Sequence, residues 1–523
     1  MFGQLFGEAA FGQVTELRIT VRTSTRISIN SDYRIYVSDE ESITGADDAP
    51  ANQPFAGSFD EPVSFEWSVL GGDFVGGFAT GKGESQIVNT DKTYDFIPAR
   101  YALDGREFEI RFGRSTDRYV DSLVSCKGVV SDFHVNKDAL RITLEDYGYK
   151  LDVPAQAKVY SGAGGINGGA DLAGKPIPRA LGYVLNVTPP LVYPNLQLYQ
   201  VNDGAVNDIT AVYDKGFPLA RGADFATVAL LLASTTIPAS TYATCIAQGY
   251  FRLNETLAGA VTCDVEGDAT GGMFATTTAA IVRRLVVLAT ELRDPVDLYL
   301  PAFVLLDTLQ PAPVGYWISH NDTISVSDVV AKLMLGIGAF AGFRRNGKFS
   351  VMRLDAPAGA PLKRFDLTGV SSPDREPLPA GINPPPPRWR IGYQRNWTVI
   401  ADPAGGVTDM RRSFLAADYR YGLAESAAIR IDHPFAKDRD PVEGFFRLQA
   451  DADAEALRRL VLFRATRALY TFAADIRDGI QLNWGDKIML TDDRWDLSQG
   501  RLMIVLRIQQ NGKAGTLDML AYG

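Results

Sequence analysis

The last hundred-odd residues constrain the fold most, because they join one helix to closely spaced strands and contain no catalytic motif. Residues 450–467 begin with acidic and end with basic side chains, an order that the helix dipole favours. Apolar side chains recur in this segment at helical spacing: Leu457, Leu460, Val461 and Phe463. We therefore expect one face of the helix to pack against the protein, while Arg458 and Arg459 stay in water.

Four strand-like segments follow this helix in quick succession: residues 468–476, 479–493, 501–510 and 516–523. Asp478-Gly479 and Asn511-Gly512 suit type I′ hairpin turns, in which both central residues have positive φ. The pattern predicts a closed antiparallel barrel at the end of the chain, fed by the helix. Such a module is typical of a scaffold and argues against an enzyme.

Length and charge limit the function classes. At 523 residues the chain is too long for one hydrophobic core, and three or four domains are expected. The net charge is −10 and the pI is near 5.1. A nucleic-acid-binding protein usually has a basic balance or a basic stripe, and the sequence shows neither. The composition therefore disfavours a stable complex with nucleic acid.

The cysteines and the terminal and apolar segments exclude further classes. Cys126, Cys245 and Cys263 lie far apart and form no CxxC pair, so the ligand spacing of a zinc or iron–sulfur site is missing. We expect three buried, reduced thiols in a protein made in the cytosol. Residues 1–13 lack the basic region of a signal peptide. The longest apolar run, near residues 281–289, contains two arginines and is too short to span a membrane.

The first part of the chain alternates polar and apolar residues, as half-buried strands do. The alternation is clear in residues 16–23, and five later segments repeat it: 28–37, 62–70, 106–114, 123–135 and 139–147. Residues 8–153 are therefore predicted to form an antiparallel β domain, either a barrel or a sandwich. Six glycines between Gly71 and Gly83 predict a mobile loop inside this domain.

The middle of the chain is less regular. Residues 154–194 are rich in glycine and proline and predict a linker or a long surface crossing. Short strand-like segments come next, and residues 278–292 then read as a helix that stops before Pro295. Ser325 is a candidate N-cap for a second helix that runs to Leu335.

Two further signals follow that helix. Asn346-Gly347 predicts a hairpin turn between residues 341–345 and 348–354. Pro384 to Pro387 predict an extended polyproline stretch, and residues 388–400 behind it alternate again as a strand that enters a core.

One segment has the spacing of a phosphate-binding loop. Gly169 to Lys175 match the glycine and lysine positions, but the next residue is Pro176. A working loop needs Ser or Thr there to hold magnesium, and its helix needs the backbone N–H groups that proline lacks. The sequence therefore argues against a nucleotide site at this position.

Other polar and aromatic residues are weaker candidates for a site. His134, His320 and His433 have no partner at metal-ligand spacing. Asp492, Asp493 and Asp496 surround Trp495 and could bind calcium or act on a glycoside, but solvated turn residues are the favoured interpretation. Five tryptophans could form a sugar-binding platform, although core or interface anchors are commoner: Trp67, Trp317, Trp389, Trp397 and Trp484.

Several segments resemble the tail-tip or baseplate hub proteins of long-tailed, siphovirus-like bacteriophages and of gene transfer agents. The segments that carry the resemblance are LAGKPIPRALGYVLNVTPPLV at 172–192, YQVNDGAVNDITAVYDKGFPL at 199–219, GYWISHNDTISVSDVV at 315–330, AFAGFRRNGKFSVMRL at 339–354 and Gly485 to Thr491. These patches lie between about residue 100 and the end of the chain, and they are architectural rather than catalytic.

The resemblance implies a mainly β fold with a few helices, in several domains. The expected boundaries are an N-terminal β-barrel-like hub domain at 1–153, a Gly/Pro-rich crossing with a peripheral β/α domain at 154–320, a connecting domain with a helix and a β-hairpin at 321–400, and a C-terminal helix with a β-barrel-like hub domain at 401–523. The two barrel-type hub domains would line the tail tube.

The same resemblance implies a structural virion protein that is not an enzyme and has no catalytic, cofactor-binding or metal-ligating residues. As a homotrimer it would continue or close the tail tube, adapt a six-fold tube to a three-fold tip and anchor other tail proteins during DNA delivery. Its expected partners are the distal tail protein or tail tube, other baseplate and tail-fibre proteins and the tape-measure protein, with DNA only in transit and no stable membrane insertion. It would be made in the bacterial host cytoplasm and would reside in the virion tail tip. The alternative is a carbohydrate-binding or carbohydrate-degrading β scaffold, such as a receptor-binding adhesin.

Overall fold

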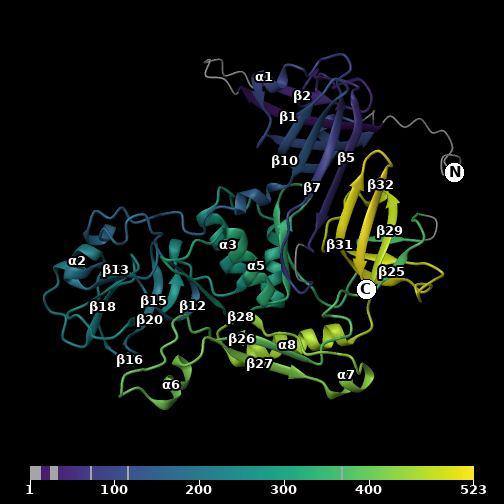
Figure 1. Ribbon diagram of the computed structural model, residues 1–523. Coiled ribbons are helices and arrows are strands. Elements are labelled where there is room, and N and C mark those ends of the chain that lie inside the picture. The colour runs from purple at the N-terminus through teal and green to yellow at the C-terminus, as the bar shows by residue number, and fades with distance from the viewer. Residues whose placement is uncertain (1–12, 24–32, 71–73, 115–116, 367–368) are drawn as a thin grey trace.

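The fold is mostly β, with 37 per cent of residues in strands and 19 per cent in helices. The computed structural model describes residues 13–23, 33–70, 74–114, 117–366 and 369–523. N-terminal strands lie at the top of Figure 1, a β-rich middle region at the left and C-terminal strands at the right, around a helical centre. The predicted class, β with a few helices in several domains, is confirmed.

One sheet of 14 strands contains strands from both ends of the chain. Its main path runs in spatial order through β2 (Tyr33–Val37), β1 (Gln13–Thr23), β9 (Glu107–Arg114), β10 (Leu123–Val135), β11 (Ala139–Glu145), β7 (Lys82–Val88), β5 (Phe59–Ser68), β31 (Arg501–Asn511), β32 (Thr516–Tyr522), β29 (Leu469–Asp475) and β25 (Asp374–Glu376). Three short strands branch from it: β8 (Tyr101–Ala102) beside β1, and β30 (Lys487–Leu490) between β31 and β24 (Lys363–Phe365). The antiparallel pairing of β5 with β31 joins the N-terminal strands to the C-terminal ones.

The described strands do not close into a barrel, so the predicted closed barrel at the end of the chain is wrong. The pairing of β31 prevents closure. One edge of β31 pairs with β32. The opposite edge pairs with β30 at its start and with β5 at its end. A strand from the N-terminal region therefore occupies the position where a closing strand would have to pair.

The middle region contains two five-stranded sheets. The first has the order β16 (Phe217–Pro218), β15 (Val206–Asp214), β20 (Val261–Asp268), β12 (Arg179–Val187) and β21 (Gly315–Ile318). The second has the order β13 (Leu191–Tyr193), β14 (Leu198–Gln200), β19 (Tyr250–Leu253), β18 (Thr241–Cys245) and β17 (Ala220–Asp224), with α2 (Val228–Ala233) beside β18 and β19. Arg252 holds the end of α2 by donating to the carbonyl oxygens of Leu231 and Leu232, each at 3.0 Å.

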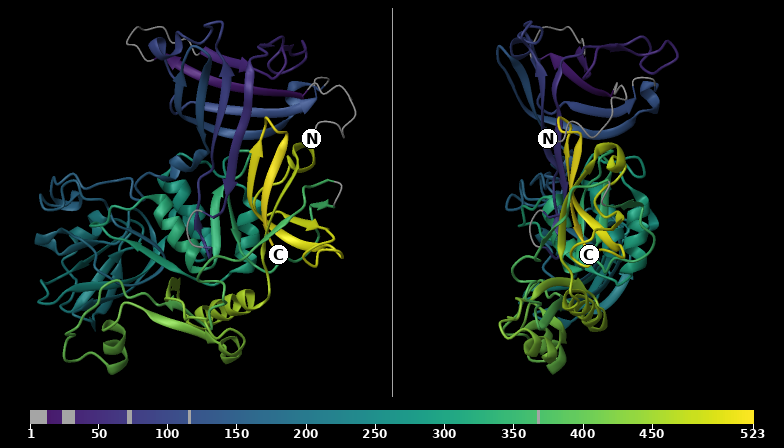
Figure 2. Two further views of the ribbon diagram at one scale, coloured as in Figure 1. Left: turned by 45° about the vertical axis from the view of Figure 1, so that its right-hand side comes forward. Right: turned by 90° about the vertical axis from the view of Figure 1, so that its right-hand side faces the viewer.

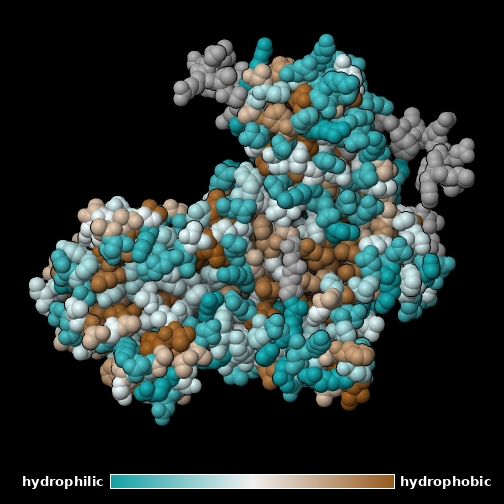
Figure 3. Space-filling view, in the orientation of Figure 1, coloured by the Kyte–Doolittle hydropathy of each residue, from teal (hydrophilic) through white to brown (hydrophobic). Residues whose placement is uncertain are grey.

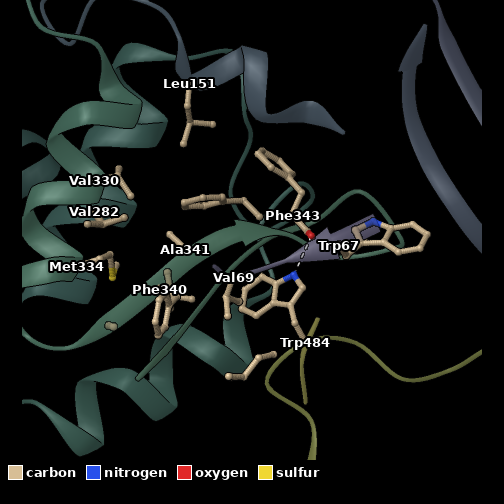
Figure 4. Close-up of a cluster of buried hydrophobic side chains, with 14 of the residues drawn as sticks. Trp67, Val69, Leu151, Val282, Val330, Met334, Phe340, Ala341, Phe343 and Trp484 are labelled. Carbon is tan, nitrogen blue, oxygen red and sulfur yellow. Dashed lines mark hydrogen bonds between the residues drawn. The ribbon is translucent and has the colours of Figure 1, made fainter. Parts of the chain in front are cut away.

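The helical centre is formed by α3 (Thr278–Ala289), α4 (Leu300–Leu309) and α5 (Val326–Gly336), beside a small sheet of β23 (Phe349–Arg353), β22 (Ala339–Phe343) and β6 (Gly77–Phe78). Figure 4 shows buried side chains that these elements share with β5: Val282, Val330, Met334, Phe340, Ala341 and Trp67. Trp484 donates its indole N–H to the carbonyl oxygen of Phe343 at 3.0 Å. The core thus connects the helices to both ends of the chain.

A third layer lies below the centre. It is the sheet of β27 (Arg420–Glu425), β26 (Arg388–Tyr393) and β28 (Val442–Phe446), which packs against α8 (Gln449–Arg464). Viewed from the side, the C-terminal strands stand between the N-terminal sheet and this layer (Figure 2, right). The remaining elements are β3 (Ser42–Ile43), β4 (Pro54–Phe55), α1 (Ile97–Arg100), α6 (Asp409–Leu415), α7 (Ala427–Asp432), α9 (Ile476–Gly479) and the short 3-10 helices at Tyr119–Asp121, Tyr147–Leu151, Gly165–Asn167, Pro194–Leu196 and Thr270–Gly272.

Several local predictions are confirmed. Helix α3 lies within the predicted range, and α5 begins after Ser325, whose side chain and that of Asp328 each accept from the other's backbone N–H. Gly347 has a φ of 76° in the turn between β22 and β23. Helix α4, by contrast, was not predicted, because its continuous apolar run LPAFVLL lacks a helical period.

Of three other local predictions, the first is wrong and the other two agree with the structure only in part. Asp478-Gly479 lies in α9, a single helical turn, and not in a hairpin turn. The hairpin at Asn511-Gly512 exists, but the positive φ falls at Gly515 (67°). The glycine-rich segment is packed in its described part: Phe74 is buried, and a Cβ at Gly76 would lie 2.7 Å from the carbonyl oxygen of Ala339. Residues 71–73 of that segment lie outside the described residues.

The prediction for helix α8 is confirmed for Leu460 and Phe463, which are buried, and wrong for Leu457, Val461 and Arg459. Arg459 is 1 per cent exposed, whereas Leu457 and Val461 are 54 and 61 per cent exposed. Arg459 donates to the carbonyl oxygens of Leu335 and Gly336 at 2.7 and 2.9 Å. The last carbonyls of α5 have no partner within their own helix, so they attract these cations inward.

A buried carboxylate balances the two arginines of α8. Glu455 accepts from Arg459 Nε at 2.6 Å and from Arg458 Nε and Nη2 at 2.7 Å each. Arg458 also donates to Asp355 at 2.9 Å. Each partner of this cluster depends on the others, because a buried charge without its counter-charge is strongly unfavourable.

We predict that Glu455→Gln lowers the free energy of unfolding by about 3–5 kcal/mol, the cost of leaving a buried cation unbalanced. Urea unfolding monitored by tryptophan fluorescence measures it, since Trp389 stacks on Phe463 of α8. The matched control is Asp440→Asn, which neutralises an exposed carboxylate just before β28 and should change stability by no more than about 0.5 kcal/mol. Equal effects of the two variants would contradict the role of the cluster.

A second buried carboxylate holds the loop before β7. Asp146 accepts from the backbone N–H groups of Gly81 and Gly148. Burial raises the pKa of Asp146 to about 7, against the lowering effect of these hydrogen bonds. The folded state therefore holds this proton more tightly than the unfolded state does. The stability that Asp146 contributes is present below its ordinary pKa near 3.8 and is lost as the pH rises through about 7.

We predict that the stability difference between the parent and Asp146→Asn narrows, or changes sign, as the pH rises from 5 to 8. Urea midpoints measured across this range provide the test. Asp91→Asn is the control with the opposite pKa shift, because hydrogen bonds from Thr93 lower the pKa of Asp91. Asp91 is therefore ionised in both the folded and the unfolded state from pH 5 to 8, and its stability difference should not change over this range. A difference that stays constant with pH would refute the assignment.

Candidate functional surface

The most extensive organised polar feature is one face of the 14-stranded sheet. Strands β11, β7, β5, β31 and β32 each alternate buried and solvent-facing residues. Because side chains alternate along a strand, this pattern places most polar positions on one face and the core on the other. Figure 1 labels β7, β5, β31 and β32 of this set, to the right of its centre, and hydrophilic side chains predominate over the upper part of the molecule in Figure 3.

The register of the strands aligns these polar side chains in rows. The first row crosses five strands in the order Glu145, Lys82, Glu66, Gln509 and Asp518, and it ends at the apolar Ala473 of a sixth. The second row crosses seven strands in the order Asp132, Thr143, Glu84, Ser64, Asn511, Thr516 and Asp475. A third, shorter row contains His134, Arg141, Gln86 and Glu61. Both long rows continue without a break from the N-terminal strands onto the C-terminal ones.

The charges on this polar face are mostly paired, with a negative surplus. Seven carboxylates (Glu61, Glu66, Glu84, Asp132, Glu145, Asp475 and Asp518) stand against four cations (Lys82, Arg141, Arg507 and Lys513), which leaves an excess of three negative charges. Lys513 contacts Glu61 at 2.9 Å, Lys82 contacts Glu145 at 3.7 Å and Arg507 contacts Glu66 at 4.0 Å. Burial raises the pKa of Asp518, and Arg507 opposes this shift.

The face is hollowed over the N-terminal strands. A groove of about 500 Å³ is lined by residues of β5, β7, β10 and β11, among them Glu84, Asp132, His134 and Arg141. Its walls are the polar rows themselves, so the groove belongs to the same surface.

The phosphate-loop-like segment has no free backbone cradle. Tyr160 N–H donates to the carbonyl oxygen of Lys175 at 2.9 Å, and Pro176 bridges to Val159. Gly174 N–H donates to the carbonyl oxygen of Tyr160 at 2.9 Å, and Lys175 N–H donates to that of Leu172 at 3.0 Å. The loop is closed on itself by these bonds, and strand β12, not a helix, follows Pro176.

The three histidines lie far apart. His134 is exposed on the polar face, and His433 ends α7 in solvent. His320 is half-buried, and burial together with Lys175 lowers its pKa. Within the described ranges, no group of three or more His, Cys, Asp or Glu side chains could hold a metal ion.

The remaining candidates are structural. Asp492 is buried and accepts from the N–H of Arg494 at 2.9 Å, while Trp495 donates to the carbonyl oxygen of Pro373 at 3.0 Å. The other tryptophans are core residues, because Trp67, Trp317, Trp389 and Trp484 are at most 4 per cent exposed. Trp397 is partly buried and stacks on Phe445. The three cysteines are buried and unpaired, as predicted, and burial raises the pKa of Cys126, Cys245 and Cys263.

The polar face could be found only in part from the sequence. Alternation in each strand marks which residues face outward, and the strands of the N-terminal region were predicted on that basis. The alignment of rows from both ends of the chain requires the β5–β31 pairing, for which the sequence carries no local signal. No helix in the described part of the chain is long and apolar enough to cross a membrane.

No protein-family model matches the chain, and no curated protein matches it. Among solved structures, the chain is similar to a tail protein from Neisseria meningitidis MC58, at 9 per cent identity over 97 per cent of this chain and 96 per cent of that one, with a TM-score of 0.41. It is also similar to a chain of the virion of a native gene transfer agent particle, at 13 per cent identity over 67 and 84 per cent, with a TM-score of 0.43. A 43 kDa tail protein of prophage MuSo2 from Shewanella oneidensis matches at 9 per cent identity over 97 and 98 per cent, with a TM-score of 0.35. At TM-scores below 0.5 these likenesses do not establish a shared fold, so the function is inferred from the chain's own residues and geometry.

We predict that ATP with magnesium leaves the thermal unfolding midpoint unchanged, because the phosphate-like loop is closed on itself, and that calcium and zinc do the same, because no cluster of His, Cys, Asp or Glu in the described residues could hold a metal ion. A ligand present at a hundred times its dissociation constant would add about 2.7 kcal/mol of stability and would be seen easily. A reproducible shift with ATP and magnesium that is lost in Lys175→Ala would contradict this interpretation.

Proposed function

We propose that this chain is a structural component of a phage-like tail, a tail-tip or baseplate hub protein whose polar sheet face lines the passage for DNA. The observation that carries the proposal is the pair of polar rows that run unbroken across five and seven strands. A tube wall needs continuous paired strands with a polar face towards the water-filled lumen and an apolar face towards the protein. The sequence segments that resemble hub proteins support the same function.

The charge of the polar face fits this role. Seven carboxylates against four cations leave a surface that repels phosphate groups at close range. Three of the four cations contact a carboxylate on the same face. Such a surface lets a polyanion pass without binding it, which a nucleic-acid-binding surface would not do.

The proposed assembly is a homotrimeric ring. Each copy would contribute its N-terminal and C-terminal strands to the wall, so that three copies present six similar segments to a six-fold tube. The middle region and the layer of α8 would then face outward, where the distal tail protein, other baseplate and tail-fibre proteins and the tape-measure protein are the expected neighbours. Subunit contacts would also cover the open edges of the sheet, which are a liability in a single copy.

A reconstruction of the particle's tail end tests the assembly. Three copies per tail, with β7, β5, β31 and β32 facing the lumen, are the expected result. Six copies, one copy, or a polar face turned towards the exterior would refute the proposal.

We predict that the triple variant Glu66→Lys, Glu84→Lys and Asp132→Lys assembles normal particles but delivers DNA at least about tenfold less efficiently, because the face changes from an excess of three negative charges to an excess of three positive ones and captures phosphates. Infectivity, or gene-transfer frequency, per assembled particle measures it. The matched control reverses three exposed carboxylates elsewhere: Asp432→Lys, Asp440→Lys and Asp493→Lys. Equal loss in both triples would mean that the polar face has no special part in delivery.

A further inference from the structure

The join between the two halves of the large sheet is short. Five residues of β31, Arg507 to Asn511, pair with Ser68 to Ser64 of β5. Two more backbone bonds extend it, from Val69 N–H to the carbonyl oxygen of Leu506 and from Gly512 N–H to that of Val63, each at 3.0 Å. Both long polar rows on the exposed face cross this join, so its register decides whether the rows remain aligned.

Hydrophobic patterning alone does not fix this register. A slip by one residue would turn the apolar side chains to solvent, but a slip by two restores the same faces. The buried face of β5 presents Val63, Phe65 and Trp67, all apolar, and that of β31 presents Ile508 and Gln510. Apolar neighbours of different size can exchange places at modest cost, whereas a polar one cannot.

Gln510 is the polar exception, and it is 2 per cent exposed. Its Oε1 accepts from Ser125 Oγ of β10 at 2.6 Å and from Arg345 Nη2 at 2.7 Å. Arg345 lies in the turn between β22 and β23, with its guanidinium 4.6 Å from the centre of a ring of Trp67. The side chain of Gln510 thus links β31 to two elements that are far from it in the sequence, β10 and the β22–β23 turn.

The contacts of Arg345 tolerate little displacement of their acceptors. It is 3 per cent exposed, and its guanidinium donates to neutral oxygens: Gln510 Oε1 and the carbonyl oxygen of Ile480 at 2.8 Å. Burial lowers the pKa of Arg345 to about 10. A buried cation held by neutral oxygens depends on each of its acceptors, so the loss of one is costly.

A two-residue slip would remove this acceptor. Strands rise by about 3.4 Å per residue, so Gln510 would move by roughly 6.8 Å along β5. Neither Ser125 nor Arg345 could reach it at that distance, and both would be left buried without this partner. The exposed pairs Glu66–Arg507 and Glu61–Lys513 have long, half-exposed side chains and contribute little selection of their own.

We propose that the node of Ser125, Gln510 and Arg345 sets the register of the β5–β31 join, which makes Gln510 the positioning residue for the polar rows. The consequence for DNA passage rests on the proposed function, but the register itself does not. The node lies on the buried side of the sheet and acts on the exposed side only through strand alignment.

Cysteine trapping in the full chain tests the register directly. Ser68 and Arg507 are direct partners on the exposed face, so Ser68→Cys with Arg507→Cys should form a disulfide on mild oxidation. The diagonal combinations Ser68→Cys with Gln509→Cys, and Glu66→Cys with Arg507→Cys, report slips of two residues in the two directions. In the parent chain only the direct pair should form, because diagonal Cβ atoms are too far apart.

We predict that Gln510→Leu raises the diagonal disulfide yield at least fivefold at the expense of the direct pair. Gln510→Glu is the matched control: it keeps both acceptor contacts, adds a counter-charge for Arg345 and should preserve the direct pair alone. Arg345→Met, which removes the demand for the acceptor, is the second variant and should also raise the diagonal yield. The proposal is overturned if folded Gln510→Leu forms the direct pair alone at the parental rate. If Gln510→Leu does not fold, the same result in folded Arg345→Met overturns it. Both readouts remain valid if the protein has no role in a tail.

Discussion

The pairing of β5 with β31 is the constraint on which the rest of the structure depends. It brings together residues more than 400 positions apart, such as Glu66 and Gln509, and makes one sheet from the two ends of the chain. Such a contact is expensive in loop-closure entropy and cannot form until the last residues are available. Until then β5 has an unpaired edge and Trp67 lacks the cover of Arg345. The N-terminal strands are therefore incomplete without the C-terminal ones, whatever their local propensity.

The elements that surround this join are fastened by buried polar groups more than by apolar contact alone. Glu455 with Arg458 and Arg459 holds α8 to the end of α5, and Gln510 with Arg345 holds the β22–β23 turn to the join. In each case the cation also donates to a backbone carbonyl, which has one fixed position. Apolar side chains tolerate small displacements, but these groups lose a partner when an element shifts. Buried polar groups of this kind favour one arrangement over its near alternatives.

The sequence predicts elements well and their assembly poorly. The strands of the N-terminal region, the capped start of α5 and the hairpin at Gly347 follow from local signals: alternation, a reciprocal cap and a residue that tolerates positive φ. The closed C-terminal barrel was wrong because the competing partner, β5, lies at the other end of the chain. Arg459 was placed in water because charged residues are usually exposed, but the carbonyls of α5 and the carboxylate of Glu455 hold it inside. Alternation in the sequence showed which side chains of the N-terminal strands face outward, but it did not show that they align in rows across the strands.

The pairing of charges on the proposed lumen wall matters more than their sum. Salt screens charges beyond about 8 Å at physiological ionic strength, so a passing polyanion senses the wall only at close approach. At that distance a phosphate meets individual cations, and Lys82, Arg507 and Lys513 are each already beside a carboxylate. Arg141 differs, because it donates to the neutral Gln86, at 2.9 Å. Within the described part of this face, Arg141 is thus the cation that a phosphate would meet with least competition. Arg141 lies in the shortest row, next to His134. This position keeps it away from the join that the two long rows cross.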